Sequence, residues 1–114
     1  VFRTRGFPVS RVRASEFCRV RTTAEQVAFG PPVETTPELT FFLYDEADRC
    51  ATAYGLLAEP PPAGTNTALF SHAGFACPVL DALDSAEAAV FKPDPPGPAL
   101  FIRRLVYSDW PGLP

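Results

Sequence analysis

Three clusters of proline divide this chain into short segments and limit the length of any helix or strand that it can form. The clusters are Pro31-Pro32, Pro60-Pro61-Pro62 and Pro95-Pro96-Gly97-Pro98. Proline has no backbone N–H and its ring clashes with the preceding helical turn, so neither a helix nor a central strand continues through such a cluster. Each cluster follows a segment with its own apolar periodicity. We therefore predict several short elements separated by turns.

The composition is that of a globular protein, and we expect one domain over residues 1–114. This length suffices to bury a core. With 46% hydrophobic and 20% charged residues, the chain is neither disordered nor a coiled coil. The net charge of −3 argues against a nucleic-acid-binding surface, and no apolar run reaches the roughly 20 residues that span a bilayer. We therefore expect neither nucleic acid nor a membrane as a partner.

Two amphipathic segments predict helices. The first follows a predicted strand over residues 9–14, begins with Ser15 as its N-cap and Glu16 in its first turn, and ends at Gly30. Its apolar stripe is Phe17, Val20, Ala24, Val27 and Ala28. The second helix spans residues 45–58, with a stripe of Ala47, Cys50, Ala51, Tyr54, Leu57 and Ala58.

The rest of the chain adds strands and one more helix. Residues 66–71 form an apolar run typical of a parallel strand covered on both faces, and a helix follows from about Pro78. Residues 87–92 and 99–107 are β-rich and predict a hairpin or a strand pair at the sheet edge. The element order β-α-β-α-β-α-β-β indicates an α/β fold around a mostly parallel sheet.

The three cysteines, Cys18, Cys50 and Cys77, leave one thiol unpaired in any scheme with a single disulfide. They form no Cys-x-x-Cys pair, so neither a redox pair nor a zinc ribbon is indicated. A zinc site from His72 and the cysteines is a weaker alternative than small buried apolar side chains. We expect no metal ion, and the compartment stays open.

The only histidine, His72, directly follows the predicted strand over residues 66–71. Ligands of open α/β sheets bind outside the carboxyl ends of the strands, so His72 is a candidate site residue. Ala73 and Gly74 would let backbone N–H groups approach a ligand closely. The alternative is a histidine that merely ends a strand.

Residues 15–25 also follow a strand and open a helix. Free N–H groups, the helix dipole and the guanidinium of Arg19 all favour phosphate oxygens there. The alternative is a solvated arginine face, which we assign to Arg11, Arg13 and Arg21.

Several enzyme classes have signatures that this chain lacks. A cysteine phosphatase needs Cys-x5-Arg, and no arginine stands six residues after any cysteine. The G-x-G-x-x-G, Walker A and G-x-S-x-G patterns of nucleotide-binding proteins and serine hydrolases are also missing.

Together, the two candidate segments resemble the histidine phosphatase superfamily, also called phosphoglycerate mutase-like. Its Ser-Ser-Pro-x-x-Arg-x-x-x-Thr-Ala-Glu motif is matched by residues 15–25, with Glu16 in place of the proline. The spacing from Arg19 to Thr23-Ala24-Glu25 holds, and residues 66–72 match the family's strand that ends in Ser-His. Residues 87–94 and 108–110 also resemble the bacterial branch with a short cap.

This resemblance implies a three-layer α/β/α fold and a phosphomonoester hydrolase without a cofactor. In the family, a histidine in an Arg-His-Gly motif attacks the phosphomonoester, and water hydrolyses the phosphohistidine. Arg19 would clamp the phosphoryl oxygens and His72 would hold the charge of the transferring group. The backbone N–H of Ala73 would assist. The partner would be a small phosphorylated substrate or inorganic phosphate.

The chain departs from the family at its first motif, since Arg-His-Gly is missing from the 114 residues. Residues 2–8 look like the end of the family's first helix, so we expect the nucleophile upstream of Val1. The chain would then be a C-terminal portion, inactive and marginally stable alone, from a cytoplasmic or exported protein. The alternative is a degenerate, non-catalytic anion-binding module. The family's acid has no match.

Overall fold

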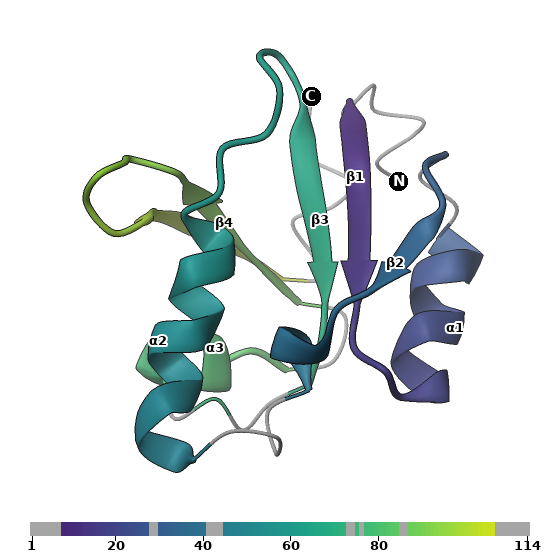
Figure 1. Cartoon of the computed structure of the whole chain (residues 1–114), viewed down its shortest axis with the longest axis horizontal. Helices are drawn as coiled ribbons and strands as arrows, with labels where there is room; N and C mark the ends of the chain where they lie inside the picture. The colour runs from purple at the N-terminus through teal and green to yellow at the C-terminus, as the bar shows by residue number, and fades with distance from the viewer. Residues whose placement is uncertain are drawn as a thin grey trace. The chain divides into compact units, whose positions relative to one another are not determined.

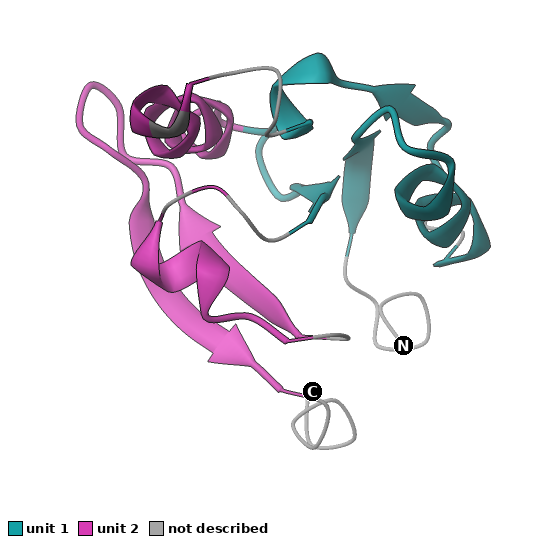
Figure 2. Cartoon of the chain, turned by 90° about the horizontal axis from the view of Figure 1, so that it is seen from below, with its two compact units in different colours: residues 1–43, 61–72 teal, residues 44–60, 73–114 magenta. Residues whose placement is uncertain are grey.

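The computed structural model describes residues 8–27, 30–40, 45–72, 75, 77–84 and 87–106 (Figure 1). The chain divides into two compact units (Figure 2). Unit 1 comprises Val1–Leu43 and Pro61–His72, and unit 2 comprises Tyr44–Pro60 and Ala73–Pro114. The expectation of one domain stays a prediction. None of the helices in the described ranges is long and apolar enough to cross a membrane.

Unit 1 is built on a parallel sheet of three strands in the order β2-β1-β3. These are β1 (Val9–Ala14), β2 (Val33–Thr35) and β3 (Asn66–Phe70), and helix α1 (Cys18–Val27) connects β1 to β2. Central β1 pairs with both neighbours. The predicted mixed α/β class and its parallel sheet are therefore confirmed. Strand β3 ends one residue earlier than expected.

The core of unit 1 lies between β1 and α1. Val12 and Ala14 alternate on one face of β1 and form a buried cluster with Val20 and Ala24 of α1. These two helix residues confirm part of the predicted apolar stripe. Val27 does not belong to it, since 41% of its surface is exposed.

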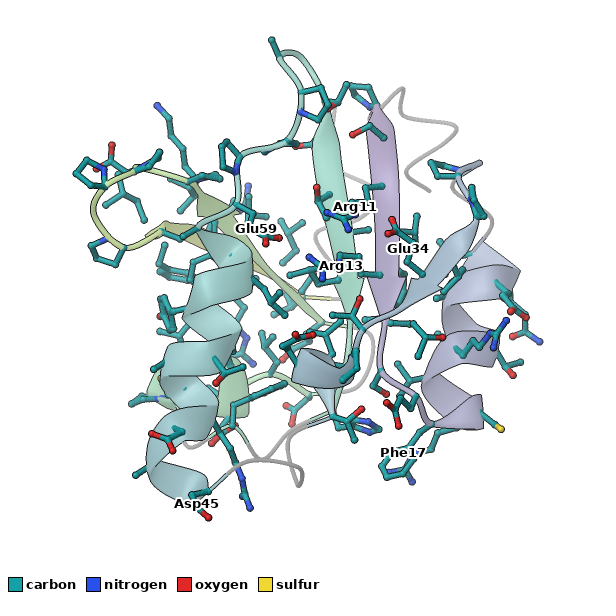
Figure 3. The ribbon with its side chains drawn as sticks, viewed as in Figure 1. Arg11, Arg13, Phe17, Glu34, Asp45 and Glu59 are labelled. Atoms are coloured by element: carbon teal, nitrogen blue, oxygen red, sulfur yellow. A yellow bond between two sulfur atoms is a disulfide. The ribbon has the colours of Figure 1, made fainter. Side chains whose placement is uncertain are left out.

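Arg11 and Arg13 alternate along β1 with the two core residues of that strand (Figure 3). Arg11 donates two hydrogen bonds to the Glu34 carboxylate, from Nε at 2.8 Å and Nη2 at 3.0 Å. This contact holds the pKa of Glu34 below its ordinary value of 4.5. Arg13 donates from Nε to Thr36 Oγ1 at 2.9 Å and is half-buried. It is therefore less exposed to solvent than we predicted for this arginine.

Helix α1 begins later than predicted, at Cys18 instead of next to Ser15. The N–H of Ser15 donates to the Phe70 carbonyl at 3.2 Å, which extends the pairing of β1 with β3 by one residue. The Phe17 carbonyl accepts the first helical hydrogen bonds, so the helix cap is Phe17. The predicted role of Ser15 as N-cap is wrong, because Phe17 accepts the first helical hydrogen bonds and the Ser15 hydroxyl contacts His72 Nε2 at 2.8 Å.

Unit 2 contains helix α2 (Glu46–Leu57), which agrees with the predicted helix to within one residue at each end. Its buried face differs in part from the predicted stripe. Ala53 is buried, whereas Ala47 and Ala51 are exposed. The predicted helix at Pro78 is confirmed as one turn, α3 (Pro78–Asp81).

The C-terminal strands of unit 2 are β4 (Ala88–Lys92) and β5 (Leu100–Leu105), which pair antiparallel as predicted. They form a two-stranded sheet of their own instead of joining the parallel sheet at its edge. The register shifts between Val90 and Phe91, so Ile102 is the extra residue of a bulge. The large side chains of β5 are unusually exposed: Leu100 and Phe101 at 46% and Ile102 at 54%.

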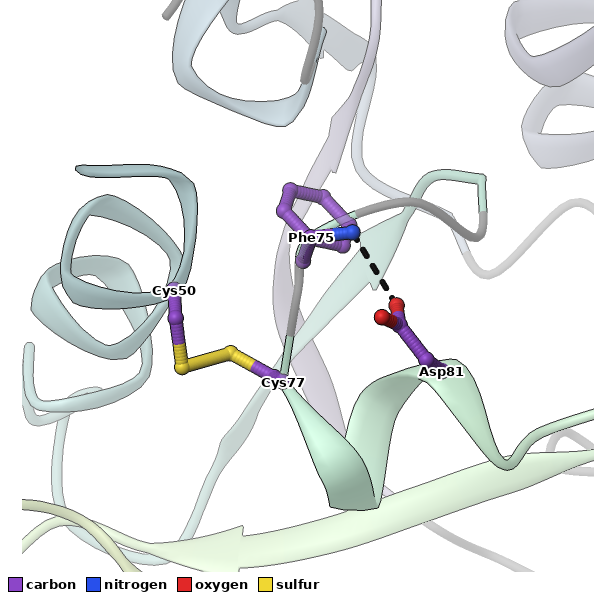
Figure 4. The surroundings of a disulfide bond; sticks show 4 residues. All are labelled: Cys50, Phe75, Cys77 and Asp81. Carbon is purple, nitrogen blue, oxygen red and sulfur yellow. Dashed lines mark hydrogen bonds between the residues drawn. A yellow bond between two sulfur atoms is a disulfide. The ribbon is translucent and has the colours of Figure 1, made fainter. Parts of the chain in front are cut away.

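A disulfide joins Cys50 of α2 to Cys77, which caps α3 (Figure 4). Near it, the N–H of buried Phe75 donates to the Asp81 carboxylate at 3.0 Å. This pairing is the scheme with a single disulfide and one unpaired thiol that the sequence left open. Cys77 is buried and Cys50 is half-buried. The third cysteine, Cys18, is free and exposed.

Candidate functional site

The site lies in unit 1, where β1 and β3 end side by side (Figure 1). Ala14 and Phe70 are register partners at the carboxyl ends of the two strands. Because the strands are parallel, the residues that follow them, Ser15 on one and Ser71 and His72 on the other, emerge at the same edge. Helix α1 begins at this edge with Cys18, three residues after Ser15, and brings Arg19 in its first turn.

Arg19 and His72 are brought together at this edge. Arg19 Nη2 lies 3.5 Å from His72 Nδ1, although the residues are 53 positions apart in the sequence. This distance confirms the prediction that they converge, while their catalytic roles stay predictions. Arg19 is exposed and His72 is half-buried, so both are accessible to a ligand.

Ser15 supplies a second contact to the imidazole. Its Oγ lies 2.8 Å from His72 Nε2, and Ser15 is completely buried. Sequence reasoning missed this role because it assigned Ser15 as a helix cap and as the first residue of the segment over residues 15–25, and gave its hydroxyl no partner in the site. The available signal was that Ser15 and His72 each stand just after a strand, and that neighbouring parallel strands end together.

Phe17, labelled in Figure 3, lies next to the start of α1 and contacts both site residues. Its ring meets the His72 ring edge-on, with the centroids 4.7 Å apart. Arg19 Cζ lies 5.5 Å from the centroid of the Phe17 ring, within the range of a cation–π contact. Phe17 therefore limits the orientations that both polar groups can take.

A pocket of about 350 Å³ opens beside these groups. It is lined by Arg19, Val20, Thr23, Phe70, Ser71 and His72. The Ser71 hydroxyl donates to the Leu39 carbonyl at 2.6 Å, and the Thr23 hydroxyl donates to the Arg19 carbonyl at 2.9 Å. Because both hydroxyls bond to backbone, the cationic and imidazole groups dominate the polar chemistry of the pocket.

The charge state of the site follows from its surroundings. Partial burial, and secondly the neighbouring positive charge of Arg19, hold the pKa of His72 below its ordinary value of 6.5. In the described part of the chain, no carboxylate forms an ion pair with Arg19, in contrast to Arg11, Arg21 and Arg104. Among the described residues, the site thus combines a guanidinium without a carboxylate partner and an imidazole whose charged form is disfavoured. That combination suits an anion.

Ala73 and Gly74 lie outside the described residues. The zinc alternative is wrong, because the disulfide consumes the thiols of Cys50 and Cys77. Within the described ranges, no group of three histidine, cysteine or acidic side chains is arranged to hold a metal ion.

No protein-family model, curated protein or solved structure matches this chain. The interpretation of the site therefore rests on its own contacts and on the two sequence segments that converge there.

Proposed function

We propose that this chain binds the phosphoryl group of a small phosphate monoester at Arg19 and His72, as the phosphate-holding part of a phosphomonoesterase of the histidine phosphatase type. One observation carries the proposal. Arg19, which has no carboxylate partner among the described residues, and the only imidazole of the chain meet 3.5 Å apart at the carboxyl ends of two parallel strands. The proposal includes a three-layer α/β/α fold of the phosphoglycerate mutase type.

The chemistry of these groups fits a phosphoryl oxyanion. A guanidinium offers a planar fork of N–H donors that matches two phosphate oxygens at once. The first N–H groups of α1 have no acceptor within the helix, and the helix dipole favours negative charge at this end. An anion in the pocket would thus receive hydrogen bonds from Arg19 and from the start of α1, with His72 on its other side.

Hydrolysis of the family's type requires two histidines. One attacks phosphorus and releases the alcohol, forming a phosphohistidine, and water then breaks the P–N bond and releases phosphate. The second histidine and the arginine stabilise charge on the transferring group. The 114 residues contain one histidine, and the contact of His72 with Arg19 suits the second role. The attacking histidine is therefore not supplied by these residues.

The presence of a single histidine favours one second candidate, a non-catalytic module that binds phosphate or a phosphorylated ligand through the same two residues. The two candidates agree on the anion pocket. They differ in whether a longer form of the protein with a second histidine hydrolyses phosphate monoesters.

The test is calorimetric titration of the 114-residue chain with inorganic phosphate, together with an assay of p-nitrophenyl phosphate hydrolysis. We expect binding without turnover. Arg19→Ala should weaken binding about tenfold or more, since charge-assisted hydrogen bonds contribute about 1.5–3 kcal/mol.

Arg21→Ala is the matched control, because Arg21 lies on the same helix but pairs with Glu25 at 3.1 Å. It should bind phosphate like the unmodified chain. Equal affinity of the Arg19→Ala variant and the unmodified chain would refute the anion site. Turnover that is abolished by His72→Ala would refute the assignment of His72 to the second role.

A further inference from the structure

We propose that Ser15 is a positioning residue for His72: its buried hydroxyl holds Nε2 of the imidazole, so that Nδ1 faces Arg19 and the pocket. The inference rests on the proposed function only in that the pocket receives an anion. It concerns how the imidazole is oriented and which of its nitrogens carries hydrogen.

The geometry makes Ser15 a fixed partner. The residue is completely buried, and its own N–H is bonded to the Phe70 carbonyl at 3.2 Å. Its hydroxyl therefore projects from backbone that belongs to the paired ends of β1 and β3. The Ser15 hydroxyl contacts Nε2 at 2.8 Å, and Arg19 contacts the other ring nitrogen, Nδ1.

Two neighbouring contacts restrict the imidazole further. The edge-on Phe17 ring packs against it with the centroids 4.7 Å apart. Ser71, the residue before His72, is anchored by its 2.6 Å hydrogen bond to the Leu39 carbonyl. The ring is thus held in place, and the hydrogen bonds at its two nitrogens decide its chemistry.

The donor and acceptor roles follow from the partners. A guanidinium has N–H donors and no acceptor, so Nδ1 accepts from Arg19 in the free protein. In the neutral imidazole the hydrogen then resides on Nε2 and is donated to Ser15 Oγ. The free protein should therefore contain the Nε2–H tautomer of His72.

When an anion binds, Nδ1 must change from a hydrogen-bond acceptor to a donor, because a sulfate or phosphate oxygen accepts a hydrogen bond. Nδ1 must then carry hydrogen. Either His72 takes one proton from solvent and Nε2–H still donates to Ser15, or the hydrogen moves to Nδ1 and Nε2 accepts from the Ser15 hydroxyl. A hydroxyl both donates and accepts, so Ser15 satisfies Nε2 in each state. An alanine at this position satisfies neither.

The test is ¹⁵N NMR of the imidazole, which is unambiguous because His72 is the only histidine. We expect the Nε2–H tautomer in the free protein. In Ser15→Ala the imidazole loses the contact that turns Nδ1 toward Arg19, so the ring can leave the guanidinium and we expect a mixture of tautomers. Sulfate is the titrant, because its charge is constant over the range of about pH 5–8 in which histidine titrates. Sulfate should add hydrogen at Nδ1, and Ser15→Ala should bind it about three- to tenfold more weakly.

Thr40→Val is the matched control. Thr40 is also completely buried near this edge, but its Oγ1 accepts from the Glu16 N–H at 3.3 Å instead of touching His72. The control should lose stability without changing the tautomer, which separates positioning from a purely structural role.

The Nδ1–H tautomer in the free unmodified protein would overturn the inference, and this measurement needs no variant. An unchanged tautomer and an unchanged sulfate affinity in Ser15→Ala would also overturn it. If the unmodified chain binds no sulfate while Ser15→Ala alters the tautomer, Ser15 positions His72 and the proposed function fails.

Discussion

His72 is held between a buried hydroxyl and a guanidinium, and its ionisation is therefore linked to folding. Burial and the charge of Arg19 both disfavour the imidazolium, so the folded protein binds a proton at this site less readily than the unfolded chain. In the window between the lowered folded pKa and the ordinary value of 6.5, the unfolded state holds more protons. Stability contributed by the neutral imidazole therefore falls as the pH drops through this window.

We expect His72→Gln to flatten this pH dependence. The urea midpoint of the unmodified chain should fall more steeply on acidification from about pH 8 to 5 than that of the variant. Glutamine keeps hydrogen-bonding groups but does not titrate, so the difference between the two profiles isolates the imidazole. Parallel profiles would show that the site does not disfavour the charged histidine.

Gly30 shows how the backbone conformation of one residue can prevent a helix from continuing. It follows α1 and has a φ of +115°, a conformation that residues with a Cβ rarely adopt. Gly55, in contrast, lies inside α2, where glycine is less favourable than alanine. A Cβ at either glycine would meet no atom within 4 Å, so conformational preference alone distinguishes the two positions.

The two glycines should therefore respond to alanine in opposite directions. Gly30→Ala is expected to lower the free energy of unfolding by about 1 kcal/mol or more, whereas Gly55→Ala should raise it by about 0.5–1 kcal/mol. Chemical denaturation of both variants checks the pair. A stabilising Gly30→Ala would contradict the observed backbone of this turn.

Local patterns predict some elements of this chain well and others poorly. The bounds of helix α2 were predictable because helical periodicity is local in sequence, although Ala47 and Ala51 of the predicted stripe are exposed. The start of α1 was not, because the hydrogen bond from Ser15 to Phe70 joins strands that are far apart in sequence. The meeting of Arg19 with His72 could be predicted, since parallel strands end at one edge. The pairing of Cys50 with Cys77 could not, because spacing carries no information about their distance.

At the scale of the whole molecule, β5 is a site where chains could associate. Among the strands that the structure describes, β5 pairs only with β4, which leaves its other edge without a strand. Leu100, Phe101 and Ile102 on this strand are all about half exposed. An apolar edge strand can pair with another chain, and lysine at such an edge opposes that pairing.

We expect the unmodified chain to self-associate as its concentration rises and Ile102→Lys to remain monomeric in sedimentation velocity. Ala51→Lys, at an exposed position of α2, adds the same charge away from β5 and serves as the control. It should associate like the unmodified chain. If Ile102→Lys associates to the same extent, the exposed edge of β5 is not responsible.

The cross-link between Cys50 and Cys77 also determines how this protein must be prepared. A disulfide persists where thiols are kept oxidised, and the glutathione of a typical cell interior tends to open it. Material made in such an environment would carry three thiols and would lack the cross-link between residues that are 27 positions apart in the sequence. Oxidised and reduced preparations are then chemically different proteins, and thiol titration should precede any comparison between them.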